Sequence, residues 1–462
     1  MQGDLGFRWA GPALILLAAV AGLRAQDAGP APQSASANTP PVTITLDEAI
    51  RRAETSDPAY ATAAGASRSA ALDKGIARAG LLPNVHANSQ DIYVQPNGIS
   101  TEGDAGQVSA PLPRFVSYDA RPWEYIAQGV ADETLSLAGV AGLRRANAAA
   151  AQAAAQQEIA RRGLVAAVTG MFYTSLAADQ KVAVAQQALQ EATDFTRITR
   201  EREQAREAAH ADVVKAELTE QASQRQLQDA QLLAERARLE LGVLLFPDPR
   251  TPYQLSAPQT PPPLAPRADV EAAAARRNPE LRSALAAVKV SDADVTAARS
   301  AYLPSAQFSI FYGIDANQFS VNGPLIPTGT KATNLGYATS FAVNLPIWDW
   351  LSTEHKVKQS EIRRQVAKVS LTNTQRLLIA RLDEAYAEAA AARDQLASLD
   401  QSASTAAESL RLTRLAYQGG DATVLAVVDA QNAYVLAENA RQDGRVRYEN
   451  ALATLQTLTG TM

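Results

Sequence analysis

One pattern of residues occurs twice in the chain, and this duplication limits the possible folds more than any other feature of the sequence. The pattern Arg-x-x-x-Leu-Pro begins at Arg78 and again at Arg299, some 220 residues later. At one shared distance before each copy stands a residue suited to a helix N-cap, followed by a proline suited to the first helical position: Asp57-Pro58 and Asn278-Pro279. Such a chain is built from two copies of one supersecondary unit.

A second set of matches lies at an offset of about 214 residues and runs without a gap. It pairs positions of similar residue type: Phe172 with Tyr386, 197–200 with 411–414, Ala216-Glu217 with Ala430-Gln431, and Leu241 with Leu455. The first structural repeat is therefore expected over residues 46–246 and the second over residues 267–462. One interwoven body is expected rather than several independent domains.

Each Leu-Pro pair predicts a switch from helix to strand. A proline removes a backbone donor and pushes the residue before it toward extended geometry. A helical pattern that reaches Pro83 or Pro304 should therefore stop and continue as a strand.

The first 25 residues have the pattern of a secretory signal peptide. An apolar run extends from Ala13 to Leu23, and small residues follow as far as Ala25. Cleavage is expected after Ala25, with Ala21 as the alternative site. The chain is therefore expected to be exported.

Two proline-rich segments flank the first repeat. Residues 26–45 contain few large apolar side chains, which predicts a flexible leader. Residues 247–266 are expected to connect the two repeats and to return the chain to the start of the second unit.

Composition and motifs argue against several classes of protein. The chain has no cysteine, so neither disulfides nor a lipidated cysteine are expected, and its formal charge of -5 argues against nucleic acid as a partner. The histidines His86, His210 and His355 stand apart, with no partner at metal-ligand spacing. No phosphate-binding loop or catalytic triad is visible, so neither a cofactor nor an enzyme is expected.

Two long segments without proline predict unusually long helices. They cover residues from about Ala138 to Arg202 and from Ser352 to Tyr417, and at ~1.5 Å per residue each helix would reach about 100 Å. A return helix is expected near Ala211–Phe246 and near Thr423–Leu458. Each return helix and the helix before a Leu-Pro switch can then lie end to end against one long helix.

Between each Leu-Pro switch and the next long helix, the sequence alternates as a strand does. Apolar residues occupy every second position over Phe308–Ile314 and Tyr337–Val343, and more faintly over Val85–Val94 and Trp123–Ala131. A turn-rich loop separates the two strands of the second repeat. No apolar run after the signal reaches the length of a spanning helix, whereas strands of about ten residues can cross a bilayer.

Four strands are too few to close a wall in a membrane. Open sheet edges are not tolerated in hydrocarbon, and closed barrels begin at about eight strands. If these strands enter a membrane, several copies of the chain must share one barrel.

With these features in place, the chain resembles the TolC family of outer-membrane efflux channels. The resemblance covers almost the whole mature chain and rests on the order of helices and Leu-Pro switches, twice over. It also rests on three sequence motifs: "LDEAI" at 46–50, "NLPIWDW" at 344–350 and "AYQGGDATVLAVVDAQNAY" at 416–434.

The resemblance implies a fold class and a set of partners. The fold is mainly α with transmembrane β: a homotrimer whose four strands per chain form one twelve-stranded barrel in outer-membrane lipid, continued by a long α-helical barrel through the periplasm. An equatorial belt surrounds the helical barrel midway, and residues 247–266 would be the equatorial segment. The implied partners are a periplasmic adaptor (membrane fusion) protein and an inner-membrane RND or ABC transporter. The channel itself catalyses nothing and conducts passively.

The resemblance also implies an aperture at the helix tips, closed by polar residues. Tyr417, Gly420 and Asp429 fit that tip pattern, and Asp212 occupies the matching part of the first repeat. Tripled by symmetry, the two aspartates would ring the lumen and attract cations, although acids on a solvated helix face are the plainer alternative. Gly419 and Gly420 are expected to end the long helix and permit the reversal.

The sequence leaves the roles of two pairs of residues undecided. Ala422 and Ala426 stand where the best-known family member has a basic and an acidic residue, which argues against a gate of the same salt-bridge type. Trp348 and Trp350 either lie among lipid headgroups or plug the junction of strand and helix, and the helix-start signals beside them favour the plug.

Three functions compete: an outer-membrane channel, a periplasmic coiled-coil adaptor and a structural coiled coil. An adaptor has one helical hairpin, whereas this sequence alternates two hairpins with two pairs of amphipathic strands. The channel is therefore the favoured hypothesis.

Overall fold

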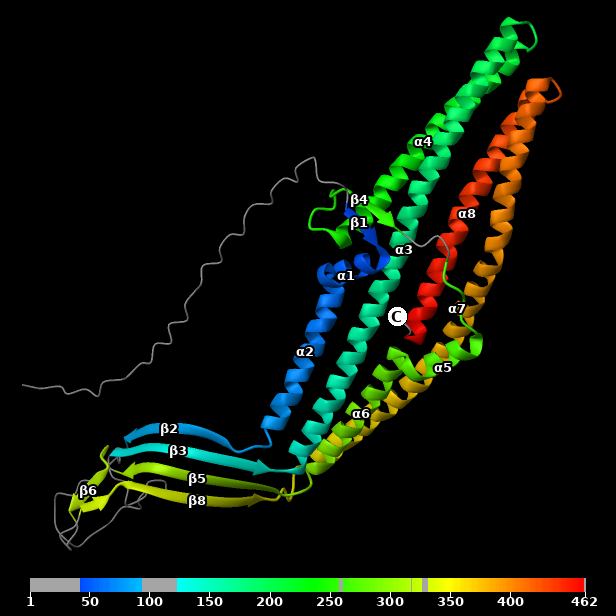
Figure 1. Cartoon of the computed structure of the whole chain (residues 1–462). Coiled ribbons are helices and arrows are strands. Elements are labelled where there is room, and N and C mark those ends of the chain that lie inside the picture. The colour runs from blue at the N-terminus through cyan, green and yellow to red at the C-terminus, as the bar shows by residue number, and fades with distance from the viewer. Residues whose placement is uncertain (1–41, 94–122, 257–260, 317, 326–330, 461–462) are drawn as a thin grey trace, which may run out of the picture. The chain divides into compact units, whose positions relative to one another are not determined.

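The computed structural model describes residues 42–93, 123–256, 261–316, 318–325 and 331–460 (Figure 1). The expected signal peptide and nearly all of the leader lie outside the described residues. Among the described helices, none contains a segment long and apolar enough to cross a membrane.

The helices of the two repeats agree in order and in length. Each repeat has helices of 11, 22, 68 and 36 residues. Those of the first repeat are α1 (Leu46–Ser56), α2 (Pro58–Ala79), α3 (Leu137–Gln204) and α4 (His210–Leu245). Those of the second repeat are α5 (Arg267–Arg277), α6 (Pro279–Ser300), α7 (Ser352–Gly419) and α8 (Val424–Thr459). The internal duplication is thus confirmed.

The repeated cap residues start matching helices. The Asp57 side chain accepts a hydrogen bond from the backbone N–H of Tyr60 at 2.6 Å, and Asn278 does the same for Leu281 at 2.8 Å. Helices α2 and α6 end a few residues before Pro83 and Pro304, and a strand begins directly after each proline.

In each repeat, the shorter helices pack along the one long helix. Helices α2 and α4 lie one after the other along α3, and α6 and α8 lie in the same way along α7 (Figure 1). Helix α3 also packs against α6 and α8, so it joins the two repeats. At ~1.5 Å per residue, α3 and α7 are each about 100 Å long.

Each repeat has its own buried core at matching positions. In the first repeat, Phe172 of α3 is fully buried against α1 and α4. In the second, apolar side chains of α5, α7 and α8 form the equivalent cluster. Arg162 of α3 is buried where the repeats meet and donates to the carbonyl oxygens of Thr457 and Arg277 at 3.1 and 3.4 Å. These bonds satisfy carbonyls that helix C-termini leave without partners.

The main sheet is antiparallel and contains strands from both repeats. Its order is β2, β3, β5, β8, so β3 and β5 join the repeats and β2 and β8 form the edges. The strands are β2 (Asn84–Tyr93), β3 (Trp123–Leu135), β5 (Ser305–Ala316) and β8 (Leu335–Asn344). The loop between β5 and β8 contains a further short pair, β6 (Asn322–Leu325) and β7 (Lys331–Thr333).

The two faces of this sheet differ in polarity. The register places Phe308 opposite Phe341 and Tyr312 opposite Tyr337, so these rings share one face. Tyr337 is 81% exposed and Phe341 70% exposed. The other face carries polar side chains, among them Asn84, His86, Gln128, Asp132, Gln307, Ser309 and Ser340.

The segments on either side of the first repeat are more ordered than the sequence suggests. Val42–Thr45, at the end of the expected flexible leader, forms strand β1, and Tyr253–Ser256 of the expected connector forms β4. The two strands pair in a small sheet. The leader prediction is therefore wrong for residues 42–45, because Ile44 is fully buried in the core of the first repeat.

Candidate functional site

The two helical hairpins, α3–α4 and α7–α8, reverse direction at equivalent positions. Gly420 follows the end of α7 in the left-handed region, with φ of 89°, and Arg206 has φ of 64° at the matching position of the first hairpin. Glycine adopts this conformation without the steric cost that a side chain brings. Thr423 then caps α8 by accepting a hydrogen bond from the N–H of Ala426 at 3.3 Å.

An apolar cluster joins the hairpins near their tips. Tyr417 is only 5% exposed and packs against Phe195 of the other hairpin, with ring centroids 4.9 Å apart. Ala216, Val424 and Val427 complete the buried part of this cluster. Tyr417, a candidate for the aperture, thus lies inside the contact between the hairpins of one chain.

Arg202 adds a hydrogen bond and a cation–π interaction to the same contact. Its Nη1 donates to the backbone carbonyl of Tyr417 at 2.5 Å, and its guanidinium lies 5.0 Å from the centroid of the Tyr417 ring. The Tyr417 hydroxyl lies 3.2 Å from Oγ1 of Thr199. A cation at the C-terminal end of α7 also interacts favourably with the helix dipole.

Further side chains join the hairpins above the tips. Arg414 donates to the backbone carbonyl of Glu191 at 3.1 Å, and Gln431 donates to the carbonyl of Ala188 at 2.7 Å. We call the contact formed by the apolar cluster, Arg202 and these two bonds the tip contact. Every polar bond in it links the first repeat to the second.

The predicted aspartates lie beside the tip contact. Asp212 is half-buried in the first turn of α4, and Asp429 is exposed on α8. Among the described residues, neither carboxylate has an ion-pair partner. Ala422 is half-buried against the apolar cluster, and Ala426 is also half-buried.

Sequence reasoning missed Arg202. The residue that matches it in the second repeat is Ala416, so the duplication gives no sign of it. Arg202 is also one of many charged residues at the end of α3. Only its contact with Tyr417 of α7 in the folded chain distinguishes it from the others.

The histidines and tryptophans occupy exposed positions. His86 lies 3.3 Å from Asp132, and His210 lies 2.8 Å from Glu203. No cluster of three or more potential metal ligands occurs within the described ranges. Trp348 and Trp350 are 67% and 84% exposed, so the favoured prediction that they plug the junction is wrong for the single chain.

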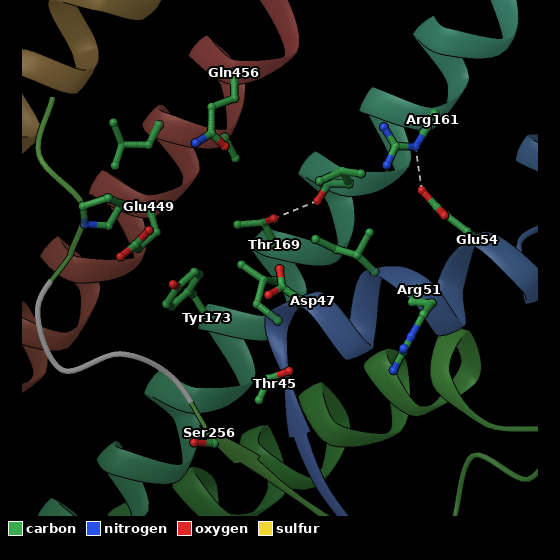
Figure 2. Close-up of a pocket in the computed structure, with 16 residues that line it drawn as sticks. Thr45, Asp47, Arg51, Glu54, Arg161, Thr169, Tyr173, Ser256, Glu449 and Gln456 are labelled. Carbon is green, nitrogen blue, oxygen red and sulfur yellow. Dashed lines mark hydrogen bonds and ion pairs between the residues drawn. The ribbon is translucent and has the colours of Figure 1, made fainter. Parts of the chain in front are cut away.

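A second candidate site is a cavity of about 1060 Å³ between α1, α3 and α8 (Figure 2). Arg161 and Glu54 form an ion pair at 2.7 Å on one side of it. On the other side, Tyr173 of α3 and Glu449 of α8 line the cavity and interact electrostatically. Glu449 is only 9% exposed, which makes it a buried carboxylate between the two repeats.

Comparison with known proteins gives a family match for the second repeat. Residues 272–461 match the family model described as outer membrane efflux protein. The second repeat is an outer membrane efflux protein domain. The protein CyaE of Bordetella pertussis is 27% identical over 417 residues, which cover 83% of this chain and 79% of CyaE.

Solved outer-membrane channels share the fold of this chain. The channel CmeC of Campylobacter jejuni matches with a TM-score of 0.73 at 16% identity, over 90% of this chain and 85% of CmeC. The open state of MtrE of Neisseria gonorrhoeae matches with a TM-score of 0.70 at 20% identity, over 90% of this chain and 88% of MtrE. The predicted mainly helical fold and outer-membrane location are confirmed, and the predicted family is borne out over residues 272–461.

Burial raises the pKa of two groups that line this cavity, Glu449 and Tyr173. It raises the pKa of Glu449 above its ordinary value, although the Tyr173 hydroxyl and the charge of Arg445 lower it in part. It also raises the pKa of Tyr173 to about 12, with further contributions from the charge and the hydrogen bond of Glu449. Folding therefore disfavours the Glu449 carboxylate.

Glu449→Gln is expected to stabilise the protein at neutral pH. Because the folded-state pKa is raised, the free energy of unfolding falls as pH rises from the unfolded pKa through the folded pKa. Glutamine removes this loss and keeps a polar side chain of similar size beside Tyr173. Thermal unfolding should give a higher midpoint than the parent at neutral pH and an equal midpoint near about pH 4.

Glu388→Gln is the matched control for this comparison. The hydrogen bond from Arg447 lowers the pKa of exposed Glu388, so its charged form favours the folded state. The sign of the shift should therefore be opposite, with a midpoint at or below that of the parent at neutral pH. A Glu449→Gln midpoint below the parent would contradict the assignment of a destabilising buried carboxylate.

Proposed function

We propose that three copies of this efflux protein form a channel across the outer membrane, continued by a helical tunnel in the periplasm. The channel conducts passively, and its substrates come from an inner-membrane RND or ABC transporter through a periplasmic adaptor. This completes a tripartite efflux or type I secretion system. The family description supports the outer-membrane role, and the proposal extends it to assembly and mechanism.

The open four-stranded sheet is the observation that carries this proposal. Strands β2 and β8 each have one partner strand in the described part of the sheet, so each leaves an edge of unpaired backbone groups. One face presents Phe341, Tyr337 and Tyr312 to the surroundings. In hydrocarbon the apolar face is favourable, but the edges must be paired, and pairing β2 of one copy with β8 of the next satisfies both needs.

The helices offer a second surface for the same assembly. Helix α7 packs mainly against α6 and α8 within the chain. Large apolar side chains stay exposed on α7 and on α2, among them Ile362, Val366, Leu72 and Ile76. Contact between α7 of one copy and the first repeat of the next would bury these side chains and extend the barrel as a helical tunnel.

The experiment uses the absence of cysteine in the chain. We would replace Ser89 of β2 with cysteine and combine it, in turn, with Tyr337→Cys, Thr339→Cys or Phe341→Cys in β8. Within one chain, β2 and β8 are three strand spacings apart, about 14 Å, which no disulfide can bridge. Oxidation should therefore link separate chains into trimers.

Two outcomes would contradict the assembly. Absence of any linked species for all three pairs would exclude a β2–β8 contact between copies. A mature protein that purifies as a water-soluble monomer without detergent would exclude the channel and support the alternative of a periplasmic coiled-coil protein.

For the tip we propose that Asp212 and Asp429, tripled in the assembly, make the entrance cation-selective. Removing both charges with Asp212→Ala and Asp429→Ala should lower the permeability ratio of cation to anion by about threefold, because the carboxylates concentrate cations at the entrance. Reversal potentials in planar bilayers under a salt gradient give this ratio. Asp229→Ala, which removes an exposed charge further along α4, is the control. Unchanged selectivity in the double variant would remove the two aspartates from the entrance.

A further inference from the structure

The two repeats differ at the junction where a strand leads into a long helix. In the first repeat, β3 ends at Leu135 and α3 begins at Leu137, and the side chain of Ser136 caps the helix. In the second repeat, the seven residues Leu345–Leu351 separate β8 from α7. The fold therefore does not need this segment to make the junction.

The extra segment presents large apolar side chains to the surroundings. Ile347 is 90% exposed, and Leu345 and Leu351 are also exposed. Trp348 and Trp350 lie side by side, with ring centroids 5.9 Å apart and planes at 71°. The segment directly continues β8, whose exposed face carries Tyr337 and Phe341. The apolar surface of the sheet thus ends in a pair of tryptophans.

The backbone of the segment holds a conformation that its residues disfavour. Trp350 and Leu351 have φ of 56° and 63°, in the region that favours glycine. Asp349 stabilises this turn, because its carboxylate accepts hydrogen bonds from the backbone N–H of Thr353, at 2.8 Å, and from the Thr353 hydroxyl. Consecutive strained residues persist only where the structure or a partner compensates them, and they often mark functional positions.

Positive charge follows directly after the tryptophans. Lys356, in the second turn of α7, is exposed and has no ion-pair partner within 4 Å among the described residues, although it interacts at longer range with the charge of Asp349. Lys358 is paired with Glu354 at 2.6 Å. Tryptophan rings next to an exposed lysine, at the end of an apolar sheet surface, are typical of the boundary between hydrocarbon and anionic headgroups.

We propose that Leu345–Leu351 and Lys356 form a lipid anchor: the tryptophan rings sit among the headgroups of the leaflet next to the helices, and Lys356 binds an anionic phospholipid there. The anchor rests on the proposed function, since the sheet must first enter a membrane. It occurs once per chain, because the first repeat lacks the segment.

Tryptophan fluorescence in brominated lipids tests the position of the rings. With the signal peptide removed, the tryptophans are Trp123, Trp348 and Trp350, so Trp123→Phe leaves only the anchor pair. The full mature chain with this change is reconstituted in phosphatidylcholine vesicles. Bromine near the headgroup should quench about half of the emission, and bromine near the bilayer centre clearly less. Equal emission in brominated and plain lipid would place the rings in a subunit interface and overturn the anchor.

A second variant separates failure of the anchor from failure of membrane insertion. It replaces all three tryptophans with phenylalanine and adds Tyr337→Trp in the middle of β8. Quenching of this reporter without quenching of the anchor pair rejects the anchor alone. Quenching of neither rejects the membrane-inserted sheet, and with it the proposed function.

The charge is tested by thermal unfolding in lipid nanodiscs. Phosphatidylglycerol should raise the midpoint of the parent above its value in phosphatidylcholine, and Lys356→Gln should lose most of this increase. Lys368→Gln is the matched control, because Lys368 is also exposed on α7 but lies about 18 Å further along the helix. An undiminished increase for Lys356→Gln, or an equal loss for Lys368→Gln, would overturn the headgroup contact.

Discussion

Arg202→Ala is expected to raise the open probability of the reconstituted channel by at least about tenfold. The substitution removes a charge-assisted hydrogen bond to the Tyr417 carbonyl and the contact with the Tyr417 ring. A hydrogen bond to a charged group contributes about 1.5–3 kcal/mol, and each ~1.4 kcal/mol corresponds to a tenfold change in an equilibrium. If opening separates the two hairpins at the tip contact, the closed state loses this stabilisation in every subunit.

Single-channel recording in planar bilayers measures the open probability. Arg197→Ala is the matched control, because exposed Arg197 pairs with Asp194 and Glu201 of its own helix. Tyr417→Phe removes only the hydrogen bond to Thr199 and should have a smaller effect than Arg202→Ala. An Arg202→Ala channel that conducts but opens no more often than the parent would show that opening leaves the tip contact intact.

The largest loss of stability is expected for Phe172→Ala. The Phe172 ring is fully buried among α1, α3 and α4, and its removal leaves a cavity that long, regular helices cannot easily fill. Truncation of a buried phenylalanine costs about 3–5 kcal/mol. Guanidinium unfolding of the detergent-solubilised protein, followed by circular dichroism, measures the difference.

Tyr386→Ala is the control that the duplication offers. Tyr386 takes the matching position in the second repeat but is half-buried, and its hydroxyl makes only a long hydrogen bond of 3.4 Å to the carbonyl of Ala265. Its truncation should therefore cost clearly less. An equal loss in both variants would show that the two cores contribute alike, despite their different burial.

Local signals in the sequence predicted most of the elements. The N-cap and proline pairs set where α2 and α6 begin, and period-two alternation marked all four strands of the main sheet. The duplication predicted helices of equal length in both repeats, which the structure has. Such signals act within one element, so they can be read without knowing what packs against it.

Contacts between distant elements could not be predicted in this way. Ile44 orders the end of the expected leader because a core that includes α3 and α4 lies beside it. The exposure of Trp348 and Trp350 accompanies left-handed backbone conformations at Trp350 and Leu351. Neither residue is a glycine, so the sequence gives no sign of this turn. Nothing in the sequence marks Glu449 or Tyr173, and Glu449 becomes buried beside half-buried Tyr173 only where α8 packs against α3.

The sequence by itself determined the repeat, the element types and the need for several copies to seal a four-stranded wall, since periodicity, proline chemistry and backbone hydrogen bonding act along one strand or helix. The tertiary structure alone decided which side chains join the hairpins at the tip. Arg202 and Tyr417 are 215 residues apart. Whether the Arg202 guanidinium reaches the Tyr417 carbonyl depends on how two helices about 100 Å long pack. A small rotation of either helix would move the guanidinium away from the carbonyl.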